Sequence, residues 1–438
     1  MKKKRLISFF LCFWVCVTLV ACNGEPIETP NASTTENSTV DGQTGTVDVQ
    51  TLRTGNWNTA KTAGGDYDRR FLPGEGGFYC LIDGYLRFYD PSSNISVTLC
   101  QKVGCLHENG QTSVARKECE ANLGAEMIFA YEGGYIYYDK EEHGQPQLYR
   151  RSADGTGEKH IAALCESYSD NKHTVQMESY FISDGVLYYT LSVASVQPDQ
   201  NGTLVQTTEY RALIRMDLSN RKAVELLRVN NASISITAAK KDAVVYSTMD
   251  LSYYEAPLSD RTEAMLNTPR CYYLWTKEAN ASRELLCKPM KECSRSISFD
   301  LGVIIALESK PPRYYSYDFV TGEQQYLDRP GDTKLNDNIY FDDVSDTFCD
   351  AAGKKYPNEL LDLSGTKYND LQISILAQGE NGLILVCRYS AIGEPNEQGV
   401  STVTASATVC SYVPYEALTD GLQIQDVTNF LSWEETYD

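Results

Sequence analysis

The feature that most constrains the fold of this chain is a short turn that recurs between alternating apolar runs. In the stretch 184–189, an Asp-Gly pair is followed by Val-Leu-Tyr-Tyr. Related turns followed by apolar or aromatic residues begin at Asp83, Gly133, Asp242 and Asn381. Asp-Gly and Gly-Gly pairs supply the positive φ angles of a tight hairpin, so each copy predicts two antiparallel strands. The pattern therefore predicts an all-β protein built from repeats.

The spacing of these turns favours one repeat architecture. Gly84, Gly134, Gly185 and Asp242 are separated by 50, 51 and 57 residues. Periods of this size with four short strands each are typical of β-propeller blades. We predict a β-propeller of four-stranded antiparallel blades, seven in number, with six or eight as alternatives. A sandwich of regular hairpins is the competing architecture.

The individual strands are predicted from alternation and turn residues. The first blade is expected to begin with strands 78–82 and 85–89, followed by a third at 95–99. The register weakens after Asp328, where a sixth blade with short strands and a seventh ending in a strand at 423–427 are expected. Helix is expected at 261–266 and 414–418 alone, the latter with Pro at its first position.

The first 22 residues predict export. A basic segment, Lys2–Arg5, precedes an apolar run from Leu6 to Val20 that is too short to span a bilayer comfortably, so residues 1–21 are interpreted as a signal peptide. The sequence Leu19-Val20-Ala21-Cys22 resembles the bacterial lipobox, which predicts that Cys22 is lipidated after cleavage. We therefore expect a protein anchored in the cell membrane by its N-terminal lipid, with the chain on the extracytoplasmic face.

Composition divides the rest of the chain into a tether and a body. From Cys22 to residue 60 the sequence is rich in Thr, Ser, Asn and Gly and cannot bury enough apolar surface to fold alone, so a disordered tether is predicted. The propeller is expected at 61–438, with a Cys-rich insert at 100–121. Removal of residues 1–21 takes away four of the 39 basic residues, which leaves 35 against 59 acidic residues and a formal charge of −24. Such a charge argues against a nucleic-acid partner.

The insert carries the sharpest local chemical pattern. Cys100, Cys105, His107 and Cys119 form a C-x4-C-x-H-x11-C arrangement. Three thiolates and one imidazole can make a closed, structural zinc site. An exported protein can instead use two of the cysteines as a disulfide that staples an irregular loop. Both interpretations stay open, and catalysis is expected from neither.

The remaining cysteines do not resolve this choice. Eleven cysteines remain after loss of the signal peptide and lipidation of Cys22, and an odd number forbids complete pairing within one chain. Several, including Cys80, Cys387 and Cys410, lie in strand-like runs and are interpreted as small buried hydrophobes. Cys287 and Cys293 are a candidate local disulfide.

Two resemblances bear on the function. The segment 148–159, which reads Leu-Tyr-Arg-Arg-Ser-Ala-Asp-Gly-Thr-Gly-Glu-Lys, resembles the blades of TolB-like propellers. The layout of lipobox, polar tether, aromatic hairpins and Cys-rich insert resembles a group of uncharacterised surface lipoproteins of low-GC Gram-positive bacteria. Those proteins share a Cys, Cys, His, Cys insert that all four positions match, as does Lys102, whereas Val103-Gly104 departs from the Pro-Asp or Pro-Asn usual there. The resemblance implies a propeller without an established activity.

No catalytic set can be identified in the sequence. His143, His160 and His173 lie in polar stretches interpreted as loops, and no nucleophile elbow, His-Glu-x-x-His, phosphate loop or dinucleotide fingerprint is present. We therefore favour a non-enzyme, namely a binding or interaction module for an extracellular ligand, glycan or protein. The alternatives are a carboxylate-dependent hydrolase or lyase of cell-surface polysaccharide and an accessory of an envelope complex. A close pair of acids, one with a raised pKa, would favour the hydrolase.

Overall fold

The structure is a computed structural model that describes residues 46–59, 70–105, 107, 118–125, 127–142, 145–165, 168, 173–198, 204–309, 312–327, 333–336, 338–342, 345–394 and 401–436. The predicted signal peptide, Cys22 and His143 lie outside these residues. Among the described residues, no helix combines the length and apolarity needed to cross a bilayer.

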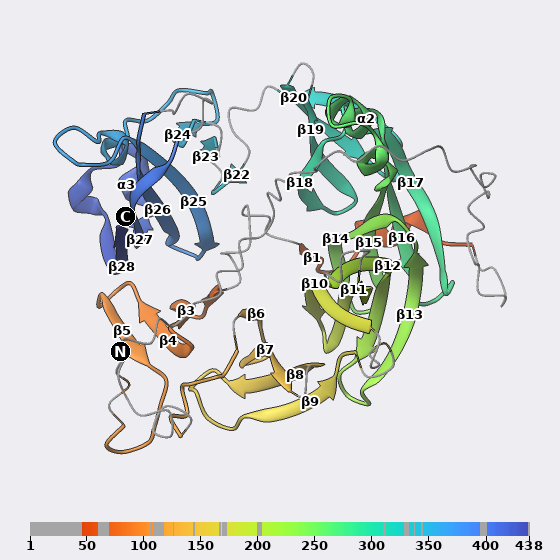
Figure 1. Ribbon diagram of the computed structural model, residues 1–438, viewed down its shortest axis with the longest axis horizontal. Helices are drawn as coiled ribbons and strands as arrows, with labels where there is room; N and C mark the ends of the chain where they lie inside the picture. The colour runs from red at the N-terminus through yellow and green to blue at the C-terminus, as the bar shows by residue number, and fades with distance from the viewer. Residues whose placement is uncertain are drawn as a thin grey trace. The chain divides into compact units, whose positions relative to one another are not determined.

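The described residues form a β-propeller of seven antiparallel sheets that follow one another in chain order (Figure 1), which confirms the predicted fold class and blade number. Five sheets have four strands, one has five and one has three. The first three sheets are β2 Phe71–Gly74, β3 Gly77–Ile82, β4 Tyr85–Asp90, β5 Ile95–Thr98; β6 Ile128–Glu132, β7 Tyr135–Glu142, β8 Gln145–Ser152, β9 Lys159–Ala163; and β10 His173–Ser183, β11 Val186–Pro198, β12 Leu204–Asp217, β13 Lys222–Val229.

The other four sheets complete the order. The fourth sheet contains β1 Asn58–Thr59, β14 Ala232–Lys240, β15 Ala243–Asp250, β16 Pro269–Thr276 and β17 Ala281–Pro289. The fifth, sixth and seventh contain β18 Arg295–Asp300, β19 Val303–Ser309, β20 Pro312–Asp318, β21 Gln324–Leu327; β22 Thr333–Lys334, β23 Ile339–Asp342, β24 Thr347–Asp350; and β25 Asp370–Gln378, β26 Gly382–Ile392, β27 Val403–Pro414, β28 Thr428–Thr436.

Short helices lie between these strands. They are η1 Val49–Arg53, η3 Ser252–Glu255, α2 Arg261–Asn267, η4 Glu359–Leu361, α3 Tyr415–Thr419 and η5 Ile424–Asp426. Both predicted helices are present as α2 and α3, and Pro414 is the N-cap of α3.

The sheets pack through their first strands. Strands β2, β6, β10, β14 and β18 contact one another in that order, and β2 also contacts β25 of the seventh sheet. Six clusters of buried side chains lie between neighbouring sheets, and buried tyrosines are prominent among them. The apolar cores of this propeller therefore lie in the joints between blades.

The recurring turns have the backbone that their residues predict. Asp184 and Gly185 have φ angles of 50° and 74° and join β10 to β11, the inner hairpin of the third sheet. Asp83 and Gly84 have the same left-handed conformation, with φ angles of 55° and 81°. This turn joins β3 to β4, which are the second and third strands of the first sheet, because the sheet begins with β2. The prediction that the first blade begins with strand 78–82 is therefore wrong.

Among the described residues, the first and seventh sheets share no strand. Aromatic side chains pack between them instead. Tyr89 of β4 stacks on Phe430 of β28, with ring centroids 4.6 Å apart. Phe71 and Tyr412 contact the same rings, and Cys80 and Cys410 are buried in the same cluster. This joint links the beginning of the propeller to its end.

The folded part begins earlier than composition indicates. Leu52 of η1 is completely buried in the cluster that joins the fourth and fifth sheets, and Arg53 forms an ion pair with Asp318. Strand β1 pairs with β14, so residues 46–59 pack on the propeller, although the sequence pattern predicts a tether to residue 60. The ammonium of Lys240 donates to the carbonyls of Thr51 and Thr54, each at 2.7 Å, beside a cavity of about 300 Å³.

Candidate functional site

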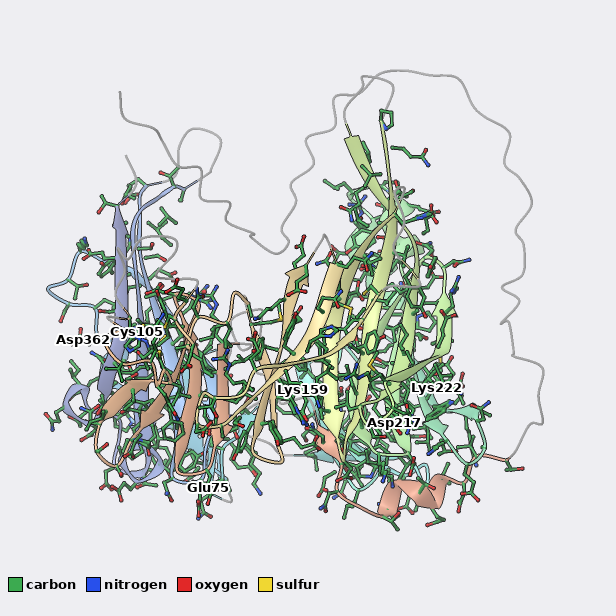
Figure 2. The ribbon with its side chains drawn as sticks, turned by 90° about the horizontal axis from the view of Figure 1, so that it is seen from below. Glu75, Cys105, Lys159, Asp217, Lys222 and Asp362 are labelled. Atoms are coloured by element: carbon green, nitrogen blue, oxygen red, sulfur yellow. A yellow bond between two sulfur atoms is a disulfide. The ribbon has the colours of Figure 1, made fainter. Side chains whose placement is uncertain are left out.

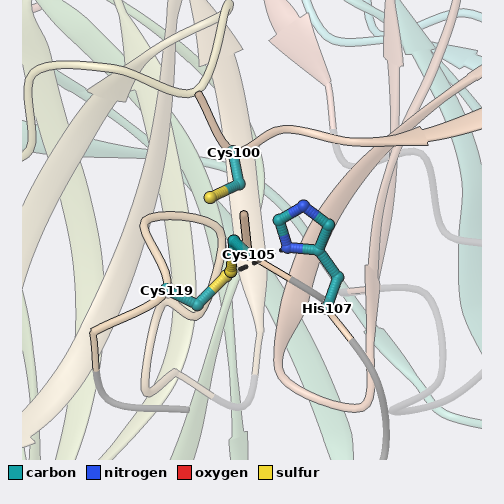
Figure 3. A group of neighbouring side chains, drawn as sticks. All are labelled: Cys100, Cys105, His107 and Cys119. Atoms are coloured by element: carbon teal, nitrogen blue, oxygen red, sulfur yellow. Dashed lines mark hydrogen bonds between the residues drawn. The ribbon is translucent and has the colours of Figure 1, made fainter. Parts of the chain in front are cut away.

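The four residues of the Cys-rich insert converge as their spacing predicts. Cys100 and Cys105 flank a turn in which the Cys105 N–H donates to the Lys102 carbonyl at 3.2 Å and Gly104 has a φ of 77°. One ligand atom from each of Cys100, Cys105, His107 and Cys119 lies within 4.8 Å of every other (Figure 3). The sequence brings these residues together from two segments of the chain.

The distances within the group suit a four-coordinate metal. The Cys119 sulfur and the Nδ1 of His107 are 3.5 Å apart. With a Zn–S bond of about 2.3 Å and a Zn–N bond of about 2.0–2.1 Å, a tetrahedral site separates sulfur from nitrogen by about 3.5 Å. Cys100, Cys105 and Cys119 are all free thiols in the structure. The four donors can therefore hold a metal ion.

The second ligand segment is fixed to the first blade by backbone hydrogen bonds. The Leu86 N–H donates to the Ala121 carbonyl at 2.8 Å, and the Leu123 N–H donates to the Gly84 carbonyl at 3.1 Å. Tyr85, Cys119 and Ala121 form a small buried cluster that Cys100 and Cys105 contact. The Asp83-Gly84 turn thus holds the segment that carries Cys119.

The second blade also contacts the segment that carries Cys119. Arg151 of β8 donates to the carbonyl of Glu120 and, at 3.0 Å, to the carbonyl of Gly155. It also forms an ion pair with Glu158 at 3.0 Å, although only 6% of Arg151 is exposed. The segment that carries Cys119 consequently contacts both the first blade and the second.

The contact between the first and second blades also depends on glycine at position 155. Its φ is +85°, and a Cβ at this position would collide with the carbonyl oxygen of Leu99, the residue before Cys100. The segment 152–157 is therefore a turn that packs against the loop that carries Cys100.

We expect Gly155→Ala to lower the free energy of unfolding by about 1–3 kcal/mol, because left-handed strain and a backbone clash act together. Gly134→Ala is the matched control, since Gly134 has a φ of +78° in the neighbouring turn and open space at its Cβ position. Denaturant unfolding of both variants checks this result. Equal losses of stability would contradict the proposed contact with Leu99.

The thiols of the group have different electrostatic surroundings. Burial alone would raise the pKa of the Cys100 thiol, but hydrogen bonds from neighbouring backbone groups outweigh burial and lower it. Burial and the Cys105 thiol raise the pKa of Cys119 to about 11. Lys102 and Glu118 form an ion pair at 2.9 Å between the two ligand-bearing segments. A bound cation would favour the thiolate form of all three cysteines.

The other cysteines form one disulfide and several buried thiols. Cys271 and Cys287 are bonded, which corrects the predicted pairing of Cys287 with Cys293. Cys293 is buried against the Tyr272 hydroxyl instead. Burial raises the pKa of Cys387 and Cys410 to about 12, as expected of thiols that serve as small hydrophobes.

The remaining described histidines lie on strands, which corrects their interpretation as loop residues. His160 of β9 lies 3.0 Å from the Gln147 side chain, and His173 of β10 lies 3.3 Å from a Glu209 oxygen. Burial raises the pKa of the Glu132 carboxyl above its ordinary value. It accepts the Asp184 N–H at 2.6 Å and so joins the second blade to the third.

Two long pairs of strands, one on the third blade and one on the seventh, are further candidates for binding. Strands β11 and β12 have 13 and 14 residues, and β26 and β27 have 11 and 12. Each pair consists of the second and third strands of its blade. In Figure 2 both pairs extend in the same direction, away from the end of the blade where Asp217 and Lys222 are labelled.

Both hairpins carry branched aliphatic side chains in solvent near their outer ends. Val196 and Val205 are 36% and 45% exposed on the third blade. Ile392 and Val403 are 37% and 45% exposed on the seventh, where they form a cross-strand pair. Sequence reasoning missed this surface, because the same alternation predicts strands whether or not a neighbouring strand covers them.

Comparisons with known proteins identify fold neighbours at low similarity. No family model matches the sequence, and no curated protein matches it. A chain of a nidogen/laminin complex is 12% identical, with a TM-score of 0.31 over 62% of this chain and 88% of that chain. TolB from Acinetobacter baumannii is 10% identical, with a TM-score of 0.28 and coverage of 83% and 81%. An oligogalacturonate lyase in complex with manganese is 11% identical, with a TM-score of 0.29 and coverage of 67% and 88%. The fold assignment rests on the strand pairings.

Proposed function

We propose that this protein is a lipid-anchored, extracytoplasmic β-propeller that binds a partner outside the cell, with zinc at the Cys100, Cys105, His107 and Cys119 centre as a structural ion. The observation that carries the binding function is the pair of long hairpins with exposed aliphatic ends. Exposed apolar side chains that pair on a projecting element, as Ile392 and Val403 do, are typical of interaction surfaces. Aliphatic side chains near the ends of the described strands and the acidic composition of the chain favour a protein partner over nucleic acid.

Zinc has a structural role in this proposal. Four protein ligands close a tetrahedral site and leave no position for substrate. The ligands lie where the first blade meets the second, beside Arg151 and Gly155. The ion would therefore stabilise this joint in addition to its backbone hydrogen bonds and buried side chains.

Lipidation of Cys22 would keep the propeller close to the membrane. Residues 23–45 separate Cys22 from the first described residue, and their composition predicts a coil. A coil of that length has a root-mean-square span of about 25–30 Å. The acidic body adds no electrostatic attraction to anionic lipids, so the acyl chains would supply the membrane affinity.

The hydrolase alternative requires a close pair of acids of which one has a raised pKa. Glu132 has the raised pKa, but its carboxylate is occupied by the backbone of Asp184. No specific observation among the described residues therefore favours this alternative.

Binding of the lipidated full chain to protein-bearing cell envelopes of the producing organism tests the function. We expect Val196→Asp or Ile392→Asp to weaken envelope binding at least about tenfold, because each places a charge on the contact surface. Val97→Asp on β5 is the matched control, since Val97 is a 51% exposed residue outside both hairpins.

The same experiment separates the alternatives. Protease treatment of the envelopes should abolish binding if the partner is a protein, and loss after polysaccharide digestion alone would identify a glycan. Release of soluble saccharides by the purified chain would contradict the binding function. For the anchor, Cys22→Ser should leave the chain unacylated and absent from the detergent phase of a membrane extract. An unchanged partition would overturn the lipidation.

A further inference from the structure

A second group of possible metal ligands lies on the fourth blade. Cys271 of β16 and Cys287 of β17 are directly opposite in the antiparallel register and are joined as a disulfide. One carboxylate oxygen of Glu284 lies within 4.8 Å of both sulfurs. This group is formed by different strands from those near the Cys100 centre and shares no residue with it.

A β-bulge brings Glu284 to the cysteines. Regular pairing would place Leu285 opposite Tyr273, but the register shifts there and Tyr273 faces Glu284. Leu285 and Leu286 both pack toward the core cluster, while Glu284 and Cys287 are exposed. A bulge re-aims the side chains that follow it, and this one puts a carboxylate on the same face as the disulfide.

The disulfide is accessible to exchange and is not needed to pair its strands. Cys287 is exposed, and Cys271 is half-buried. The backbones of β16 and β17 already pair from Pro269 opposite Pro289 to Thr276 opposite Ala281. A thiolate reaches an exposed disulfide more readily than a buried one, and exposed disulfides are typically the labile ones.

We propose that Cys271, Cys287 and Glu284 form a redox-gated binding site for a divalent cation with affinity for thiolates, such as zinc. The disulfide closes the site, because neither bonded sulfur is a thiolate. Reduction opens it by supplying two thiolates beside the carboxylate. Three protein ligands leave a fourth position for water, in contrast to the four-ligand Cys100 centre.

The gating reaction is a thiol–disulfide exchange with an external dithiol as the reductant. One thiolate of the dithiol attacks a sulfur of the Cys271–Cys287 bond and forms a mixed disulfide, and the cysteine that leaves is protonated. The second thiol of the reductant resolves the mixed disulfide. The products are two cysteine thiols and the oxidised dithiol, with two electrons and two protons transferred to the protein. Cation binding then displaces the two thiol protons.

Zinc titration of the purified full chain tests the proposal with zinc alone as the probe. We expect about one tightly bound zinc per chain before reduction and about two after reduction with a phosphine that binds no zinc. Alkylation without reductant should spare Cys271 and Cys287, whereas reduced, zinc-free protein should be alkylated at both. The circular dichroism of the sheets should persist after reduction.

The variants distinguish this site from the first. Glu284→Gln should weaken the second zinc at least about tenfold and leave the first unchanged. Glu278→Gln, an exposed carboxylate in the turn between the same two strands, is the matched control. Replacing both Cys271 and Cys287 with serine should abolish the second zinc alone, and Cys119→Ser the first alone. No gain of zinc on reduction, an unaltered gain in Glu284→Gln, or alkylation of both cysteines before reduction would overturn the proposal.

Discussion

Replacing Cys119 with serine is expected to abolish zinc binding at the Cys100 centre and to lower the free energy of unfolding by at least about 3 kcal/mol. A structural zinc in a small domain contributes about 10–16 kcal/mol of apparent binding free energy. Part of that energy is expected to reach the fold here, because the ligands lie at a joint between two blades. Metal analysis and denaturant unfolding of the same preparation check both effects.

Cys349→Ser is the matched control for this prediction. Cys349 and Cys119 are each 2% exposed, but Cys349 lies on β24, in the sixth sheet. It should keep the zinc and lose about 1 kcal/mol, the ordinary cost of placing a hydroxyl in a thiol site. Equal zinc content in the two variants would show that Cys119 is not a ligand.

Tyr89→Ala is expected to lower the free energy of unfolding by about 3–5 kcal/mol, the range for removing a fully buried aromatic ring. Tyr89 is 1% exposed and stacks on Phe430, so its ring joins the first strands of the chain to the last. The loss should appear as a lower denaturation midpoint. The expected loss of stability is large because removal of the ring leaves a cavity between the first and seventh sheets.

Two variants control this result. Tyr89→Phe keeps the ring and removes the hydroxyl, whose contact with Asn94 is 3.3 Å long, so it should cost less than about 1.5 kcal/mol. Tyr254→Ala removes a ring that is 54% exposed and should also cost little. If Tyr89→Ala were as mild as Tyr254→Ala, the contact between the first and seventh sheets would not stabilise the protein.

The fold was largely predictable because its turns are chemically distinctive. Tight hairpins require a left-handed backbone that Asp-Gly and Gly-Gly pairs accept and few other residues do, so Gly134 and Gly185 mark hairpins without knowledge of the tertiary structure. The strands missed have weaker signals. Strand β2 contains Pro73 and Gly74, which argue against a strand in the sequence pattern. The predicted strand at 423–427 precedes the real β28, because η5 occupies most of that stretch.

The N-terminal boundary illustrates a different limit. Residues 46–59 are polar on average, and composition predicts disorder for such a segment. Leu52 and Val47 are both buried between the fourth and fifth sheets, and Arg53 and the carbonyls of Thr51 and Thr54 find partners on those blades. Docking of this kind depends on contacts that no local pattern contains.

The same contrast between local sequence signals and tertiary contacts applies to the candidate sites. Cys100, Cys105, His107 and Cys119 were found because ligand type and spacing are local properties of the chain. Arg151, Gly155 and Glu284 could not be found, because their roles depend on packing between blades or on the register of one bulge. The Cys271–Cys287 pairing likewise follows from strand register, whereas sequence proximity favoured Cys287 with Cys293.

X-ray absorption at the zinc edge of the purified full chain, kept oxidised, tests the proposed metal centre most directly. The geometry predicts three sulfur neighbours at about 2.3 Å and one nitrogen neighbour at about 2.0–2.1 Å, with no bound water. The absence of zinc, together with a mass two hydrogens lower for a pair drawn from Cys100, Cys105 and Cys119, would instead establish a disulfide and contradict the metal centre.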